Sequence, residues 1–168
     1  MTRAVAVMMS TVSAVISLTA AGEQRAAARV APQRLAIYYG YPSLVNGASG
    51  DIGRAVAAFA GYDVIVFGDG LEFDDVDARR LPPGPGSDEH RRTRAIIEAL
   101  RRQSRSLRIY GYVDLGNSQR LTDLEIADRA QRWSQMGATG IFLDEAGYDY
   151  GVTRDRQNTA IDAIHRLG

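Results

Sequence analysis

Four short apolar segments alternate along the chain with stretches of helical periodicity, and this alternation constrains the fold more than any other feature. The apolar segments are residues 35–39, 62–67, 108–113 and 140–143. Parallel strands need a crossover between neighbours, and strands buried on both faces appear as continuous hydrophobic runs. The sequence therefore predicts successive βα units built around a parallel sheet.

The stretches between these segments carry signals for helices. We expect helices within residues 50–60, 90–104, 122–136 and 153–167. Thr122 and Glu125 form a capping box at the start of the third, and Leu124 and Trp133 are expected on its buried side. Thr153 is expected to cap the last helix, which carries Ile161, Ile164 and Leu167.

The length of the chain limits how much of a barrel it can hold. At 168 residues it is short for an eight-stranded barrel, which typically needs about 250 residues. The predicted fold is α/β, with the first four βα units of a TIM-type (β/α) barrel, as a half-barrel or truncated barrel, over residues 34–168. An open half-barrel exposes strand edges and apolar surface, so we expect a homodimer that closes it.

The N-terminal residues have the pattern of a secretory signal peptide. Arg3 precedes an apolar stretch over residues 4–18, and small residues follow up to Gly22. We therefore expect residues 1–22 to be a signal peptide, residues 23–33 a linker, and the protein to be secreted or at the cell surface. Membrane insertion is not expected, because a spanning helix needs about 20 strongly apolar residues.

Charge and composition argue against several classes of function. The 20 basic and 20 acidic residues balance, so no net charge favours nucleic acid. The absence of cysteine excludes disulfides, thiolate metal sites and a cysteine nucleophile. The segment Gly68-Asp69-Gly70 lacks the Lys-Ser/Thr that follows a phosphate-binding loop. We expect no cofactor and no metal.

Acidic residues follow three of the four expected strands. Asp69 follows the second strand, Asp114 the third, and Asp144 and Glu145 the fourth. The loops after the strands form the active site in barrels of this type, and neighbouring carboxylates can divide the roles of acid and base or nucleophile. We predict that Asp144 and Glu145 are catalytic. The alternative is that such residues only cap turns or helices.

Further side chains at the same end of the sheet are candidates for binding substrate. Tyrosine offers a stacking face and a hydroxyl, although it is also common in strands. A divalent metal held by the three aspartates, as in a phosphodiesterase, is a less specific alternative. The predicted substrate-binding residues are Asp114, Tyr38, Tyr39, Asp69 and Tyr148.

Several segments together resemble the spherulin-four (spherulation-specific) family, related to barrel enzymes that cleave α-1,4-linked galactosamine polymers. The most specific segment is GIFLDEA, and the resemblance extends over residues 35–167. One departure is at residues 67–70, where Phe-Gly-Asp-Gly replaces the family's Asn-Pro and Gly-Pro-Gly signature. The segments that carry it are residues 37–42, 111–114 with Arg120, 126–133 and 140–146.

The resemblance implies a secreted (β/α) barrel that hydrolyses polysaccharide containing N-acetylgalactosamine. By position, Asp144 and Glu145 match the family's acidic pair, and Asp114 lies in the motif of the third strand. The family also uses a further catalytic Glu on a later strand, which would lie beyond Gly168. The alternative to a glycosidase is a noncatalytic or truncated half-barrel that binds carbohydrate.

Overall fold

The structure, a computed structural model, describes residues 32–68, 70–74 and 87–167. The chain divides into two units, and the described residues all belong to the unit Pro32–Gly168. The expected signal peptide at 1–22 and most of the expected linker at 23–33 lie outside the described residues. Asp69, one of the predicted substrate-binding residues, lies outside them as well.

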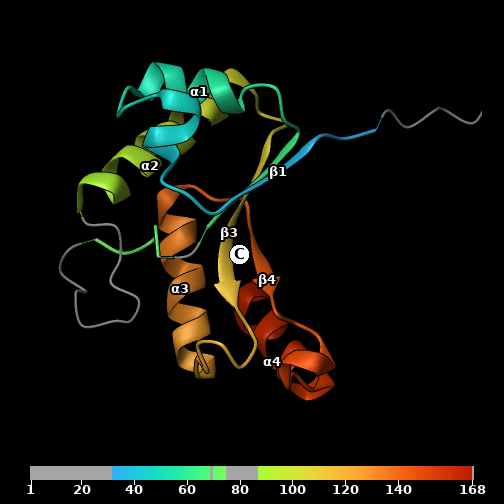
Figure 1. Cartoon of the computed structure of the whole chain (residues 1–168). Helices are drawn as coiled ribbons and strands as arrows, with labels where there is room; N and C mark the ends of the chain where they lie inside the picture. Colours follow the sequence, from blue (N-terminus) through green and yellow to red (C-terminus); the bar gives the residue numbers. More distant parts are fainter. Residues whose placement is uncertain (1–31, 69, 75–86, 168) are drawn as a thin grey trace, which may run out of the picture. The chain divides into compact units, whose positions relative to one another are not determined.

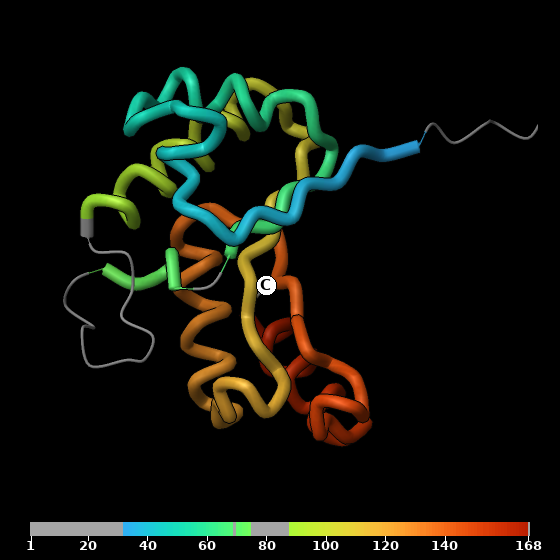
Figure 2. Tube along the Cα trace, viewed as in Figure 1, coloured from blue at the N-terminus to red at the C-terminus, as the bar shows by residue number. Residues whose placement is uncertain are grey.

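Strands and helices alternate through the described unit, as the sequence predicts (Figure 1). The strands form one parallel sheet in the order β1-β2-β3-β4, and Figure 2 shows the chain passing from each strand through helical turns to the next. The elements are β1 (Leu35–Tyr38), η1 (Pro42–Gly47), α1 (Ile52–Phe59), β2 (Val64–Phe67), α2 (Ser87–Gln103), β3 (Arg108–Asp114), α3 (Asp123–Met136), β4 (Gly140–Asp144), η3 (Tyr148–Tyr150) and α4 (Arg154–His165). The α/β class is confirmed, and the four consecutive units are compatible with half of a (β/α) barrel.

The helices begin and end at residues whose local chemistry explains the boundaries. Asp51 caps α1 by accepting a hydrogen bond from the backbone N–H of Arg54 at 2.9 Å. The predicted capping box of Thr122 and Glu125 is present at α3, and Thr153 caps α4. Gly137 ends α3 in the left-handed region with φ 97°, which costs glycine no steric clash.

The helices cover one face of the sheet. Strand residues on this face, including Ile65, Phe67, Ile109 and Val113, are buried in one cluster with residues of α1 to α4. Trp133 of α3 lies against Gly111 of β3 so closely that a Cβ atom there would overlap the indole ring. Its indole Nε1 donates a hydrogen bond to the carbonyl of Tyr112 at 3.0 Å. The prediction that Trp133 belongs to the core is confirmed.

One expectation about an apolar helix residue is wrong. Leu124 is 83% exposed, because the buried side of α3 runs through Ile126, Ala130 and Trp133 and leaves Leu124 facing away. On α4 the buried residues are small alanines, whereas Ile161 is 40% exposed. Within the described part of the chain, no helix has the length and apolar character needed to cross a membrane.

Candidate functional site

The candidate site lies where β3 and β4 end, on the face of the sheet that the helices leave uncovered. Asp114 and Asp144 are the last residues of these strands and are direct partners in the parallel register. Residues at matching positions of neighbouring strands point to the same face, and the strands lie about 4.8 Å apart. Two carboxyl groups are therefore adjacent at the carboxyl edge of the sheet.

The two carboxyl groups differ in their exposure to solvent. Asp114 is only 2% exposed, whereas Asp144 is half-buried. Asp114 therefore forms the floor of the site and Asp144 its accessible side. A ligand approaching from the uncovered face would meet Asp144 first.

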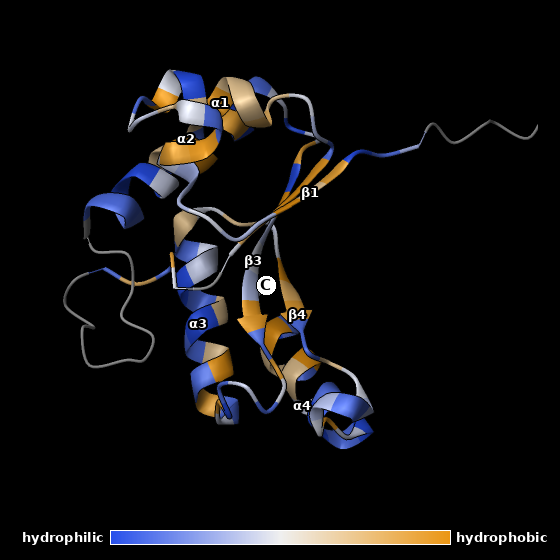
Figure 3. Cartoon of the chain, in the orientation of Figure 1, coloured by the Kyte–Doolittle hydropathy of each residue, from blue (hydrophilic) through white to orange (hydrophobic). Residues whose placement is uncertain are grey.

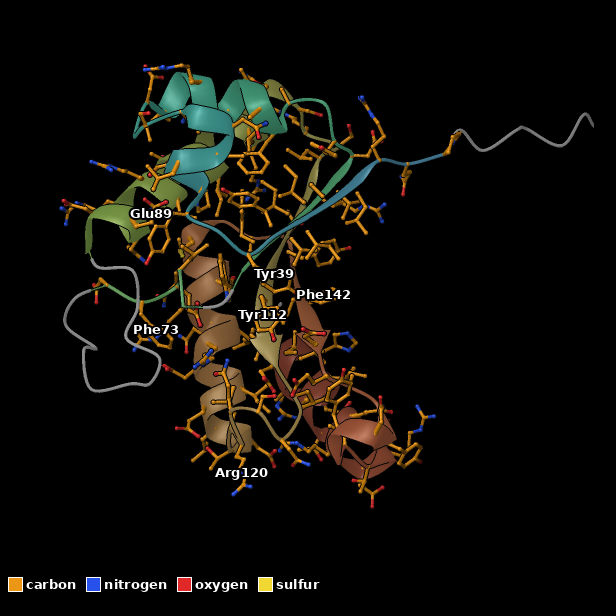
Figure 4. All side chains as sticks on the ribbon, viewed as in Figure 1. Tyr39, Phe73, Glu89, Tyr112, Arg120 and Phe142 are labelled. Atoms are coloured by element: carbon orange, nitrogen blue, oxygen red, sulfur yellow. The ribbon has the colours of Figure 1, made fainter. Side chains whose placement is uncertain are left out.

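Three aromatic side chains, Tyr39, Tyr112 and Phe142, lie near one another on the uncovered face (Figure 4). The hydroxyl of Tyr39, which follows β1, donates a hydrogen bond to Oδ2 of Asp144 at 3.3 Å. The ring of Tyr39 lies edge-on to that of Tyr112 at 5.5 Å between centroids, and Tyr112 lies 6.4 Å from Phe142. Tyr39 thus crosses the sheet from β1 toward β4. Gly68 makes room for it, since a Cβ there would lie 2.8 Å from the Tyr39 backbone.

The carboxylates keep the neighbouring tyrosines protonated. Burial raises the pKa of Tyr112, and the hydrogen bond to Asp144 and the charges of Asp144 and Asp114 raise it further. The pKa of Tyr39 is also raised, first by burial and then by the charge and hydrogen bond of Asp144. A phenolate beside a carboxylate would place two like charges together. Both hydroxyls therefore remain hydrogen-bond donors at neutral pH.

Glu145 points away from Asp144, toward the loop after β3. Its backbone lies in the left-handed region at φ 50°, which few residues other than glycine adopt. The carboxylate accepts hydrogen bonds from the hydroxyl and the backbone N–H of Ser118, the latter at 3.2 Å. Gly116 permits this approach, because a Cβ there would lie 2.5 Å from the side chain of Glu145. The two residues predicted as a catalytic pair thus have different surroundings.

Two further predicted residues, Tyr38 and Tyr148, lie apart from the carboxyl pair. Tyr38 lies on the helix-covered face, where its ring meets Phe59 edge-on at 5.5 Å. Tyr148 is 73% exposed in η3, on the loop after β4. Of the seven predicted site residues, the structure brings together Asp114, Asp144 and Tyr39 on one face.

Three residues of the site were not among those predicted. Tyr112 and Phe142 line the uncovered face, and Ser118 holds Glu145. The two-residue alternation of β3 carries a signal for Tyr112, since it is two positions before Asp114 and so shares its face. No sequence pattern indicates Ser118, because its role depends on the turned backbone of Glu145.

Side chains of α4 hold the loops that follow β3 and β4. Arg156 donates to the carbonyl of Leu115 at 2.8 Å and to that of Leu121 at 2.7 Å. The side-chain amide of Gln157 donates to the carbonyl of Ala146. Because both donors come from the first turns of one helix, the two loops that flank the carboxyl pair are fixed relative to each other.

A buried ion pair holds the segment after β2. Glu72 and Arg129 are 3.4 Å apart and are both nearly inaccessible to solvent. The guanidinium groups of Arg129 and Arg132 lie 5.1 and 5.2 Å from the centroid of the Phe73 ring. A buried ion pair needs such supporting contacts to offset its desolvation. These contacts fix the described end of the long β2–α2 connection on α3.

Two further observations bear on what the site is. Among the described residues there is no group of three or more His, Cys, Asp or Glu side chains that could hold a metal ion, and Asp69, the third member of the metal alternative, lies outside them. A scan of protein-family models found no match to the chain, and a search of curated proteins found none. The site therefore has to be interpreted from its own chemistry.

Proposed function

We propose that the chain is a glycoside hydrolase domain that acts on polysaccharide containing α-1,4-linked galactosamine or N-acetylgalactosamine. The observation that carries the proposal is the adjacent pair Asp114 and Asp144 at the carboxyl edge of a parallel sheet, beside Tyr39 and Tyr112. The choice of polymer follows the resemblance of segment 140–146 to the spherulin-four family. The proposal includes a secreted protein and a TIM-type (β/α) barrel closed around the site.

The spacing of the two carboxyl groups fits a retaining mechanism. Neighbouring strands lie about 4.8 Å apart, so we infer that the carboxyl groups can approach the separation of about 5–5.5 Å that retaining glycosidases use. In such a mechanism one group protonates the leaving oxygen while the other attacks the anomeric carbon. Asp144, which is accessible and accepts a hydrogen bond from Tyr39, is assigned as the nucleophile, and the buried Asp114 as the acid.

Aromatic surface near the pair supports a sugar as the ligand. Tyrosine rings present an apolar face to the C–H groups of a sugar ring, and their hydroxyls bond to its oxygens. Tyr39 is 61% exposed and Tyr148 73% exposed, so both can contact a polymer that lies across the carboxyl edge. Arg156 and Gln157 would keep the loops in place while the polymer binds.

A second candidate is a noncatalytic domain that binds the same polymer. The observation that favours it is Glu145, whose carboxylate is already bound to Ser118 and turned from the sheet face. If hydrolysis requires Glu145 beside Asp144, the arrangement found here binds sugar without cleaving it. Catalysis and binding therefore have to be measured separately on the same variants.

The test is release of reducing ends from an α-1,4-galactosamine polymer, with and without N-acetylation. The Asp144→Asn variant should lose at least about 100-fold in rate, the scale of a lost catalytic acid or base. Asp114→Asn should lose a similar factor, whereas Asp162→Asn on the exposed side of α4 serves as a control with the same chemical change and full activity. Circular dichroism of each variant checks the fold.

The Glu145→Gln variant distinguishes between the two candidate catalytic pairs, Asp114 with Asp144 and Asp144 with Glu145. A loss in this variant equal to that in Asp144→Asn, with Asp114→Asn still active, would identify Asp144 and Glu145 as the working pair. If Asp144→Asn retains full activity, the assignment of the site is wrong. Binding of the polymer without turnover, measured by calorimetry on the unmodified chain, would favour the noncatalytic candidate.

A further inference from the structure

The two edge strands and the last helix expose apolar side chains that the described residues do not cover. On β1 and just after it, Leu35 is 54% exposed, Ile37 43% and Tyr39 61%. On and after α4, Ile161 is 40% exposed and Leu167 41%. Figure 3 shows hydrophobic colouring along both edge strands, β1 and β4. Apolar surface therefore gathers at both edges of the same sheet.

Both edges of the sheet can also pair with a further strand. Among the described residues, β1 has a neighbour only in β2, and β4 only in β3. All four strands are parallel and follow one another in sequence order, with their helices on one face. An edge of this kind accepts a parallel strand whose helix lies on the same side. The edge of β1 and the edge of β4 can satisfy each other if they come from different chains.

We propose that two copies of the chain close into one eight-stranded (β/α) barrel, in which β4 of each copy pairs in parallel with β1 of the other. The contact joins two different surfaces, and a two-fold rotation forms it twice and leaves no edge open. The number of strands fits, because a (β/α) barrel has eight and the described residues of each copy contribute four. The inference depends on the sheet and not on hydrolysis at the site.

Exposed apolar side chains supply part of the area that a stable pair requires. Leu35, Ile37, Ile161 and Leu167 are each 40–54% exposed, so a partner would remove apolar surface of all four from water. Stable interfaces bury roughly 800 Å² per partner. The half-exposed residues of β4, Gly140–Asp144, and the paired strand edges supply the remainder.

The geometry of a closed barrel also specifies which residues meet. The register of the sheet connects Ile37 of β1 through Val66 and Tyr110 to Gly140 of β4. An eight-stranded barrel has a shear of about eight residues, so each copy contributes a displacement of about four. Four residues along β4 from Gly140 is Asp144, which therefore pairs with Ile37 of the partner subunit.

The same displacement pairs Leu143 with Ala36 of the partner subunit. A displacement by an even number of residues keeps every side chain on its own face of the sheet, and the displacement of four residues is even. Leu143 packs against the helix-covered core, and Ala36, one residue from Ile37, shares that face. Tyr39 of the partner subunit would follow its β1 beside the carboxyl edge of β4. The closed pair would therefore place tyrosines on both sides of Asp144.

The first test is the mass of the full chain in solution by sedimentation equilibrium. The expected mass is twice the 18.3 kDa of one chain. Ile37→Glu and Ile161→Glu should each convert the pair to single chains, because one places a charge on the edge strand β1 and the other on the exposed apolar side of α4. Leu124→Glu is the matched control, since Leu124 is apolar and 83% exposed but lies on α3, and it should leave the pair intact. A folded single chain without any substitution would overturn the proposal.

The second test fixes the register and does not depend on the charged variants folding. The chain has no cysteine, so Ala36→Cys with Leu143→Cys introduces the same possible bridge at each of the two contacts. Directly paired positions suit a disulfide, and oxidation should give a covalent pair of twice 18.3 kDa on a non-reducing gel. Ala36→Cys with Ile141→Cys keeps the same face but shifts the pairing by two residues, to roughly 8 Å, which a disulfide cannot span. Equal cross-linking in both double variants, or none in the first, would overturn the proposed register.

Discussion

The two faces of the sheet are similar in composition and opposite in surroundings. On the helix-covered face, Ile65, Phe67 and Ile109 are fully buried. On the other face, Ile37 and Tyr39 at the β1 edge are 43% and 61% exposed, whereas Val66 and Tyr112 of the central strands are buried. A sheet that is apolar on both faces is typical of folds in which both are covered. The first face holds the core of the chain, and the second holds the candidate site and the exposed edge strand.

The two faces also differ in chemistry. Every strand side chain in the hydrophobic cluster of the helix-covered face is apolar or aromatic, whereas the other face ends in Asp114 and Asp144 with tyrosine hydroxyls beside them. Stability and function are thus assigned to opposite sides of the same strands. This division predicts that substitutions on the two faces have separable effects on stability and on function.

The largest effect is expected from removing a large aromatic side chain on each face. Trp133→Ala should cost about 3–5 kcal/mol of unfolding free energy, because Trp133 is fully buried against Gly111. Phe142→Ala should cost about 1–2 kcal/mol, since Phe142 is only half-buried within one chain. Both should be measured by urea denaturation in the Ile37→Glu background, so that each chain stands alone. Equal losses would contradict the difference between the faces.

A smaller effect is expected at alkaline pH on the uncovered face. The raised pKa of Tyr112 means that its protonated form stabilises the folded state fully below its ordinary pKa of 10.0. This contribution is lost as pH rises above that value, because the unfolded chain releases the proton first. The denaturation midpoint should therefore fall above about pH 10, and Tyr112→Phe should reduce the fall. Tyr148→Phe is the control, and an equal reduction there would show that the pKa of Tyr112 is not raised in the folded state.

The smallest effect is expected from a helix cap on the covered side. The pKa of Asp51 is lowered by hydrogen bonds from backbone N–H groups, first that of Arg54, so its ionised form stabilises the folded state. That contribution is present above the ordinary value of 3.8 and is lost as pH falls through the lowered folded-state pKa. Asp51→Ala should lower the denaturation midpoint slightly at neutral pH and not at all in strong acid. A difference that stays constant with pH would show that the charge contributes nothing.

The sequence predicts the elements of this fold well and their contacts less well. Apolar runs and capping residues such as Thr122 and Thr153 are local signals, so the strands and helix starts could be predicted from them. Leu124 was assigned to the wrong side of α3, since counting apolar residues does not show which side the sheet will cover.

The candidate site could be located from the sequence but not assembled from it. Acidic residues after strands indicate the functional edge, and Asp114 and Asp144 are there. Their adjacency depends on register, and a shift of one residue would place them on opposite faces. The orientation of Glu145 depends on its left-handed backbone conformation and on contacts with Gly116 and Ser118. Those two residues belong to the loop after β3, and Ser118 precedes Glu145 by 27 residues. No local pattern contains that information.

The position of Trp133 makes it an intrinsic fluorescence probe for the candidate site. It is the only tryptophan, and its indole N–H is bonded to the backbone of Tyr112, whose ring lies at the candidate site on the other face. Indole emission responds to changes in hydrogen bonding and in the surrounding dipoles. A ligand that displaces Tyr112 should therefore change the fluorescence of a residue it never touches. Binding, pairing and unfolding of the unlabelled protein can all be followed through this one side chain.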